Sequence, residues 1–168
     1  GDHRDLHSFP TRRSSDLNVL LDQQNTATNF SIDNDNRGIE FTVAGATKIA
    51  SKGVQGSTVK LNTAGLTQTG AITATSLDVN NSAGAVALTN ALNSLTDVEI
   101  ANAGNSVSFT NSAATNISTD GVQGSTVILN TAGLTQTGAI TATSLDVNNS
   151  AGAVVLTNAA NSLTDVAI

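Results

Sequence analysis

Two stretches of this chain have nearly the same sequence, and this repeat limits the folds open to it. Residues 53–100 and 121–168 are identical at 44 of 48 aligned positions, which defines a 68-residue repeat. The four differences are Lys60 to Ile128, Ala87 to Val155, Leu92 to Ala160 and Glu99 to Ala167. Long sequence repeats are typical of solenoids and propellers, in which each unit packs on its neighbours. We expect one full repeat over 53–120 and a truncated one over 121–168, in a fragment of a longer protein.

A shorter period is visible inside the long one. Triplets with aliphatic or Phe residues at their first and third positions recur along the chain, with successive spacings of 20, 20, 27, 21, 20 and 27. They begin at Val19, Ile39, Val59, Val86, Val107, Val127 and Val154. We interpret the long repeat as three coils, which correspond to the spacings 27, 21 and 20. Further strand patterns between the triplets, such as Leu77-Asp78-Val79, give each coil more than one side.

The alternation within these triplets predicts an all-β fold. Alternate side chains of a strand point to opposite faces, so the aliphatic residues of each triplet face inward and the middle residue faces outward. Coils of about 20–27 residues that stack in this way form a right-handed parallel β-helix (a β-solenoid), here over residues 18–168, with about seven coils. Lys60, Glu99 and Ala87 take outward positions, where replacement is tolerated. Asn residues after the triplets are expected to form hydrogen-bonded amide ladders between coils.

The N-terminal segment 1–17, GDHRDLHSFPTRRSSDL, does not fit this pattern. It resembles, codon for codon, the translation of a short-read sequencing adapter. We therefore interpret residues 1–17 as an artefactual segment without fixed structure and exclude it from fold reasoning. The alternative for residues 1–17 is a real basic N-terminal arm. The alternative for the 68-residue repeat is a false duplication introduced in sequence assembly. Both histidines and the only proline lie in this segment.

The composition of the remaining chain excludes several classes of function. Residues 18–168 contain four cationic and ten anionic side chains, which gives a net charge of −6. Such a surface disfavours nucleic acid and anionic lipid, which are bound by basic patches. No apolar run is long enough to span a membrane. His, Cys and Tyr are absent, so thiolate and imidazole metal sites and cysteine nucleophiles have no residues to form them.

The phrase GLTQTGAITATSLDVNNSAGAVALTNALNSLTDVEIANAGNSVSFTN, together with its copy, resembles the repeat regions of filamentous-haemagglutinin-like adhesins and autotransporter passengers. The resemblance covers residues 53–168. It implies a right-handed β-helix, export across the outer membrane and an extended stalk on the bacterial cell surface.

Few side chains in this chain are candidates for chemistry. Asp97 and Glu99 alternate with Val98 in one strand, so both would sit on one strand face, where a carboxylate pair could perform acid–base work. The second copy has Asp165 with Ala167, which favours solvated surface charges instead. Asp33 and Asp35, in a predicted turn, are candidates for a weak cation site, with ordinary turn residues as the alternative.

Two further patterns involve Thr and Asn. Thr-x-Thr pairs, which could order water on an ice-binding face, occur at Thr67/Thr69, Thr73/Thr75, Thr135/Thr137 and Thr141/Thr143. Thr is also a good strand former. Asn-x-Ser sequons occur at Asn29, Asn80, Asn116 and Asn148. In a chain this rich in Asn and Ser, they are expected by chance.

We therefore expect a structural and adhesive stalk segment of a large secreted bacterial surface protein, associated with the outer membrane but not embedded in it. The segment is predicted not to be an enzyme and to have no catalytic, cofactor-binding or metal-binding residues. Its expected partners are neighbouring coils of the full-length protein and host or matrix glycans or proteins. A polysaccharide-active β-helix enzyme is the first alternative, and an ice- or matrix-binding solenoid is the second.

Overall fold

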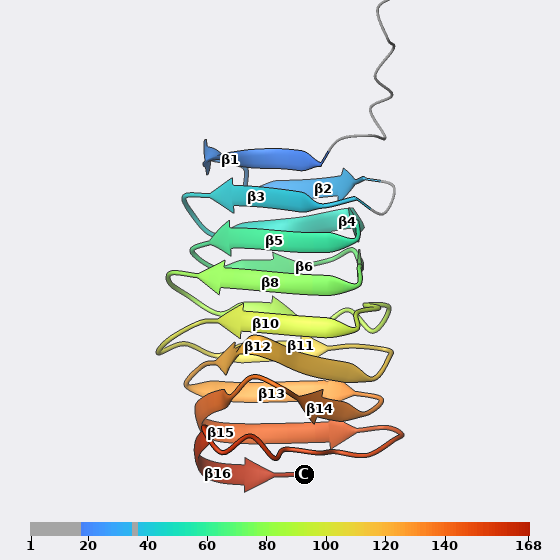
Figure 1. Ribbon diagram of the computed structural model, residues 1–168. Helices are drawn as coiled ribbons and strands as arrows, with labels where there is room; N and C mark the ends of the chain where they lie inside the picture. The colour runs from blue at the N-terminus through green and yellow to red at the C-terminus, as the bar shows by residue number, and fades with distance from the viewer. Residues whose placement is uncertain (1–17, 35–36) are drawn as a thin grey trace, which may run out of the picture.

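The described chain, residues 18–34 and 37–168 of a computed structural model, is all-β and winds into a β-solenoid of about seven turns (Figure 1). Strands at the front run from right to left and those at the rear return from left to right as the chain descends, so the winding is right-handed. The predicted parallel β-helix is thus confirmed. The adapter-like segment, residues 1–17, lies outside the described residues.

The strands form two opposed ladders joined into one sheet. The front ladder in Figure 1 consists of β1 (Val19–Asn25), β3 (Ile39–Val43), β5 (Thr58–Thr63), β8 (Ser76–Asn81), β10 (Asp97–Ala101), β12 (Thr115–Gln123) and β14 (Leu134–Gln136). The rear ladder consists of β2 (Asn29–Asp33), β4 (Thr47–Gln55), β6 (Leu66–Gln68), β7 (Ile72–Thr73), β9 (Val86–Leu88), β11 (Val107–Thr110) and β13 (Thr126–Thr131). The strand β15 (Ile140–Asn149) pairs with both β12 and β13, and β16 (Ser162–Ala167) pairs with β15.

The pairing register corrects the predicted coil lengths. Val59 pairs with Leu77, and Leu77 pairs with Val98. One front coil therefore runs from Val59 to Leu77, and the next runs from Leu77 to Val98. Val86 instead belongs to the rear ladder, where it pairs with Leu66. The expected long coil from Val59 to Val86 is therefore wrong, because it joined triplets from opposite faces. The Leu77-x-Val79 pattern, expected on an additional side, is the true next rung of the front ladder.

The long repeat corresponds to three and a half coils. From β5 the chain passes through β6, β8, β9, β10, β11 and β12, alternating between rear and front, before it reaches β13. β13 has the sequence of β5 with Ile128 in place of Lys60, but it lies in the rear ladder. Each repeat therefore turns the next by half a revolution, and equivalent residues of the two copies lie on opposite faces.

The inward side chains form a single apolar column. The burial of β5 alternates along the strand, with Val59 and Leu61 buried and Lys60 exposed. Phe109, at mid-height, has no exposed surface. Burying an aliphatic or aromatic side chain of this size stabilises the fold by about 1.5–3 kcal/mol. The predicted inward positions are confirmed, apart from the end coils, where residues such as Leu21 (43% exposed) lack a covering coil.

Buried amides connect the coils at the corners, although the hydrogen bonds between amides form at other asparagines than those that follow the predicted triplets. Asn81 Nδ2 donates to Asn102 Oδ1 at 2.7 Å, and the hydroxyl of Thr63 donates to Asn81 Oδ1 at 2.9 Å. Because unpaired buried amides are costly, such ladders fix the register of one coil on the next. The bend between the halves of β4 requires glycine. Gly53 has a φ of 76°, and a Cβ there would overlap the carbonyl oxygen of Ala71.

Candidate functional site

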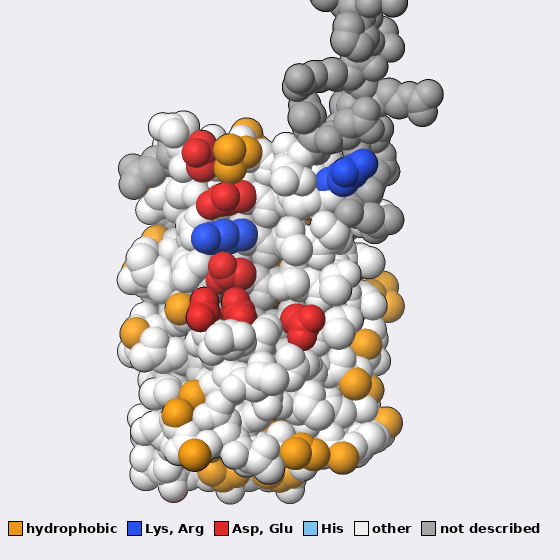
Figure 2. Space-filling view, in the orientation of Figure 1, with side chains coloured by type: hydrophobic (Ala, Val, Ile, Leu, Met, Phe, Trp, Pro, Cys, Tyr) orange, Lys and Arg blue, Asp and Glu red, His pale blue; other side chains and the backbone are white. Residues whose placement is uncertain are grey.

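A column of charged side chains lies on the front face. The outward positions of β3, β5, β8 and β10 pair in register and carry Glu40, Lys60, Asp78 and Glu99. Asp120 joins the lower end, where its backbone N–H donates to Glu99 Oε1 at 3.3 Å. We call these five residues the charged column. Figure 2 shows a vertical run of acidic and basic side chains from the top of this face to about its middle, and the lowest part of the face carries neither colour.

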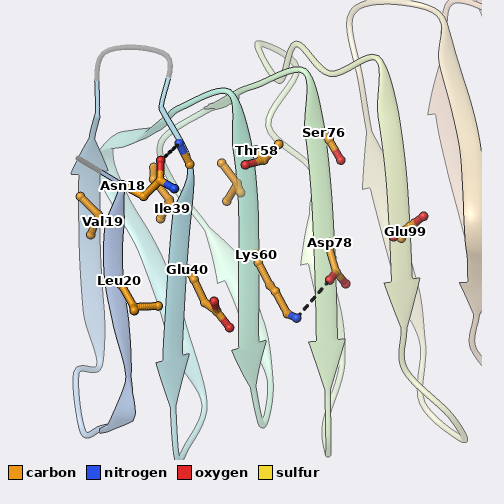
Figure 3. A pocket seen from close by; sticks show the side chains of 12 residues that line it. Asn18, Val19, Leu20, Ile39, Glu40, Thr58, Lys60, Ser76, Asp78 and Glu99 are labelled. Atoms are coloured by element: carbon orange, nitrogen blue, oxygen red, sulfur yellow. Dashed lines mark hydrogen bonds and ion pairs between the residues drawn. The ribbon is translucent and has the colours of Figure 1, made fainter. Parts of the chain in front are cut away.

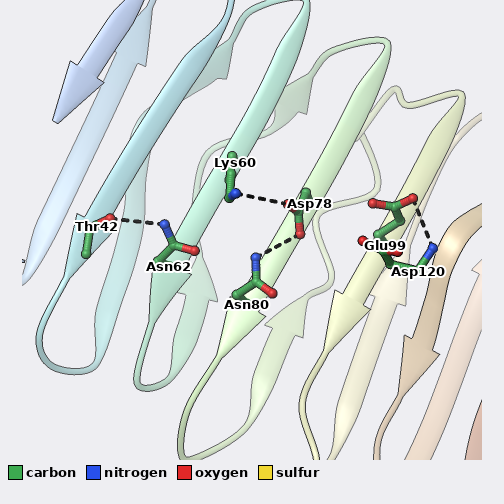
Figure 4. Close-up of polar contacts among 7 residues, drawn as sticks. All are labelled: Thr42, Lys60, Asn62, Asp78, Asn80, Glu99 and Asp120. Carbon is green, nitrogen blue, oxygen red and sulfur yellow. Dashed lines mark hydrogen bonds and ion pairs between the residues drawn. The ribbon is translucent and has the colours of Figure 1, made fainter. Parts of the chain in front are cut away.

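Asp78 is the electrostatic centre of the charged column. Its carboxylate lies 4.0 Å from the Lys60 ammonium and accepts a hydrogen bond from Asn80 Nδ2 at 3.0 Å (Figure 4). Burial raises the pKa of Asp78 above its ordinary value, and the negative charges of Glu99 and Asp120 raise it further. Lys60 and the hydrogen bond from Asn80 oppose this effect only in part. Asp78 therefore holds a proton more readily than a free aspartate does.

An open groove of about 570 Å³ runs along the charged column from Glu40 to Glu99. It is lined by the outward faces of β1, β3, β5 and β8, and Lys60 and Asp78 approach each other within it (Figure 3). Leu20 lies on one side of the groove and is 58% exposed. The groove offers one cationic and several anionic groups close to an apolar edge.

A second outward column lies further along the same strands. Thr42, Asn62 and Asn80 pair in register on β3, β5 and β8. Asn62 Nδ2 donates to the Thr42 hydroxyl at 3.0 Å (Figure 4). These three residues, which we call the front amide column, line a shallow groove of about 400 Å³. The residues that line this groove carry no charge.

Both columns have counterparts on the rear face. Thr110, Asn130 and Asn148 pair in register there, and Asn130 Nδ2 donates to the Thr110 hydroxyl at 3.1 Å. This rear amide column lines a groove of about 390 Å³. The counterpart of the charged column is almost neutral, since its positions hold Ser108, Ile128, Asp146 and Ala167. The amide column is thus duplicated, whereas the charged column is not.

The structure places the predicted carboxylate pair in two separate sets of contacts. Asp97 and Glu99 both point outward from β10 and are half-buried. Asp97 Oδ1 accepts a hydrogen bond from Asn116 Nδ2 at 2.9 Å, while Glu99 pairs in register with Asp78. The partner of Glu99 is therefore a carboxylate of the coil above, which the sequence analysis missed. The step from the Leu77-x-Val79 pattern to the Val98-x-Ile100 pattern, taken as one coil, would have indicated this neighbour.

The other candidate residues are dispersed. Asp33 ends β2 with an exposed side chain, and Asp35 lies outside the described residues. Among the described residues, no group of three or more His, Cys, Asp or Glu side chains is placed to hold a metal ion. Of the sequon residues, Asn29, Asn80 and Asn148 are exposed, whereas Asn116 is half-buried.

The Thr-x-Thr pairs do not continue from coil to coil. All the threonines of these pairs are exposed. Thr67 pairs in register with Lys48 above it and Ala87 below it. Its copy, Thr135, pairs with Asn116 and lies on the opposite face. The described chain therefore has no stacked threonine array of the kind that an ice-binding face uses.

Comparisons with known proteins find no matching family model, curated protein or solved structure. Over residues 18–34 and 37–168, no helix is long and apolar enough to cross a membrane. The assignment of a role to this β-solenoid therefore depends on its own geometry.

Proposed function

We propose that this chain is a stalk segment of a secreted bacterial surface protein, with adhesive capacity spread over its outer faces. The observation that supports this proposal is the 68-residue repeat, which adds three and a half coils without changing the inward column. At about 4.8 Å per coil, each additional copy lengthens the rod by about 17 Å. Copy number thus sets the reach of the protein.

The outer surface agrees with a passive, extended role. Beyond the adapter-like segment, the cations are confined to Arg37, Lys48, Lys52 and Lys60, and residues 121–168 carry only Asp146 and Asp165 as charged groups. Amide and hydroxyl groups make up most of the remaining polar surface. Such a surface offers many weak hydrogen-bonding sites rather than one deep pocket, as distributed adhesion requires.

Chain-length variants test the stalk. Proteins with one and two additional 68-residue copies inserted after residue 120 are compared with the original by small-angle X-ray scattering. We expect the longest dimension to grow by about 17 Å per copy while the cross-section stays constant. Growth of the cross-section, or no growth in length, would contradict the stalk. Immunolabelling of intact and lysed cells of the source organism tests surface location, and label confined to lysed cells would contradict it.

A polysaccharide-active enzyme is a second candidate because three carboxylates, Asp78, Glu99 and Asp120, lie together on adjacent coils of one face. The raised pKa of Asp78 suits a general acid. The test measures release of reducing ends from neutral and acidic glycans by the full chain and by Asp78→Asn. Turnover that is lost in Asp78→Asn would favour the enzyme, and absence of turnover would favour the stalk.

A further inference from the structure

The two amide columns are the same arrangement displayed twice. In each, a threonine and two asparagines occupy three successive coils, and the first asparagine donates to the threonine hydroxyl at 3.0 Å in front and 3.1 Å at the rear. The second asparagine donates to the nearest aspartate of its own strand in both columns, Asp78 in front and Asp146 at the rear. The grooves are nearly equal in volume, about 400 and 390 Å³.

The outer atoms of these columns match a hydroxyl-rich ligand. Asn62 Oδ1 and Asn80 Oδ1 accept no hydrogen bond from the described chain, and each amide still has an N–H bond to offer. A surface that presents both donors and acceptors without net charge suits vicinal hydroxyl groups, which also donate and accept. An anionic ligand would meet no cation within the rear column, since residues 121–168 contain none.

The vertical spacing favours a polymer. Successive coils are about 4.8 Å apart. A pyranose ring has a similar length along its chain, so one sugar unit could face each coil. A polysaccharide that lies parallel to the solenoid axis would then contact all three residues of a column.

From these features we infer that the front column (Thr42, Asn62 and Asn80) and the rear column (Thr110, Asn130 and Asn148) are equivalent binding sites for a neutral polysaccharide chain. This inference rests on the proposed adhesive function and deepens it. Because the repeat turns by half a revolution, the two sites face opposite directions. One protein molecule therefore holds two polysaccharide chains and cross-links them, instead of lying flat on one surface.

The test uses electrophoresis of the full chain through gels that contain dextran, galactomannan or hydroxyethylcellulose. We expect at least one of these neutral polymers to retard the protein. Two double variants, Asn62→Ala with Asn80→Ala and Asn130→Ala with Asn148→Ala, each remove one site. Each should still bind, with half the number of polymer sites per protein, and the fourfold variant should bind at least about tenfold more weakly.

Cross-linking separates two sites from one. Light scattering of the chosen polymer should rise when wild-type protein is added, but not with either double variant. Asn29→Ala, an exposed change outside both columns, is the matched control and should behave as wild type. If an alanine variant fails to fold, the isosteric pair Asn130→Asp with Asn148→Asp removes the N–H donors and should give the same loss.

Three results would overturn the inference. These are an absence of retardation in all three gels, retardation of the fourfold variant equal to that of wild type, and cross-linking by a double variant at the wild-type level. The stalk is judged separately by the scattering measurement on chain-length variants. A rod that lengthens with copy number but binds no neutral polymer would leave the proposed function standing and remove only the polysaccharide sites.

Discussion

The pair β5 and β8 at the front and its copy at the rear, β13 with the second half of β15, share one backbone arrangement but differ in their outer surfaces. Their registers are the same, with Thr58 opposite Ser76 in front and Thr126 opposite Ser144 at the rear. The inward aliphatic residues of both pairs are at most 2% exposed. The one outward difference between the pairs, Lys60 in front and Ile128 at the rear, leaves the register and the buried column unchanged, so an outward side chain can change without altering the coil.

Two of the four differences between the copies fall on the charged column. Lys60 becomes Ile128 and Glu99 becomes Ala167, and the position of Glu40 is taken by Ser108. Only Asp78 keeps its identity, as Asp146. These changes remove most of the charge from one column while the neighbouring amide column is retained. Charge is therefore not needed to stack the coils, and the retained amides are the shared surface feature of the two copies.

The bends should respond equally in both copies. Gly53 and Gly121 have φ values of 76° and 78°, and in both a Cβ would overlap the carbonyl oxygen of the coil below. We expect Gly53→Ala and Gly121→Ala each to destabilise the protein by more than about 1–3 kcal/mol, the cost of the strained backbone alone. Chemical denaturation followed by circular dichroism measures the loss. If only one variant is destabilised, the two bends are not equivalent.

The Asn–Gln pair that joins neighbouring coils occurs in both copies, and we expect its loss to destabilise the two copies unequally. Asn93 has no exposed surface, exchanges two hydrogen bonds of 2.9 Å with Gln68 and accepts the Ile72 N–H at 2.8 Å. Its copy Asn161 makes the same exchange with Gln136 at 2.8 Å, but in a half-buried site. Asn93→Ala should cost about 2–4 kcal/mol, because it strands buried polar groups worth roughly 1–3 kcal/mol each.

Asn161→Ala is the matched control for that prediction. Water can replace the lost amide in the more open site, so its cost should stay below about 1.5 kcal/mol. Urea denaturation of both variants gives the two values. Equal losses of stability in the two variants would show that burial does not determine how much this Asn–Gln pair contributes.

The faces of the strands are easier to predict from the sequence than their stacking. Period-two alternation assigned the inward residues correctly, as in Val98-Glu99-Ile100, because the rule is local. The stacking register is not local. The triplets at Val59 and Val86 look alike although they lie on opposite faces, so the half-turn between copies could not be read from spacing alone.

Because the stacking register could not be predicted, the candidate site predicted from the sequence lacked Lys60 and Asp78. Asp97 and Glu99 were recognised as a pair from their positions in one strand. Lys60 and Asp78 were not linked to Glu99, because their proximity depends on the lengths of the two coils that separate them. The charges that shift the pKa of Asp78 come from other coils, and only the folded register brings them together.

Single substitutions can change the charged column into its neutral counterpart one residue at a time, and the pKa of Asp78 reports the effect of each. Because this pKa is raised above the ordinary 3.8, the folded state binds the proton more tightly than the unfolded chain does. The associated stability is fully present below pH 3.8 and is lost as the pH rises through the folded pKa. Glu99→Ala should lower the pKa of Asp78, and Lys60→Ile should raise it.

Carbon-detected NMR titration of the Asp78 carboxyl measures both shifts. At neutral pH, Glu99→Ala should change the free energy of unfolding by no more than about 0.5 kcal/mol, as expected for a surface charge. Shifts of the same sign in the two variants would mean that burial alone, and not the column, controls this carboxylate.

A small effect is also expected when a positive charge is introduced on the rear face. Ile128 is half-buried and points outward, opposite Asp146 in register. Ile128→Lys should therefore change the free energy of unfolding by less than about 1 kcal/mol, with any gain from the new ion pair weakening as salt is added. Its control is the adjacent inward change Leu129→Lys. Leu129 is 1% exposed, and a charge buried there should cost several kcal/mol. If Ile128→Lys proved as costly as Leu129→Lys in urea denaturation, outward positions of the two copies would not be interchangeable, and the freedom of the outer columns inferred from the comparison would be wrong.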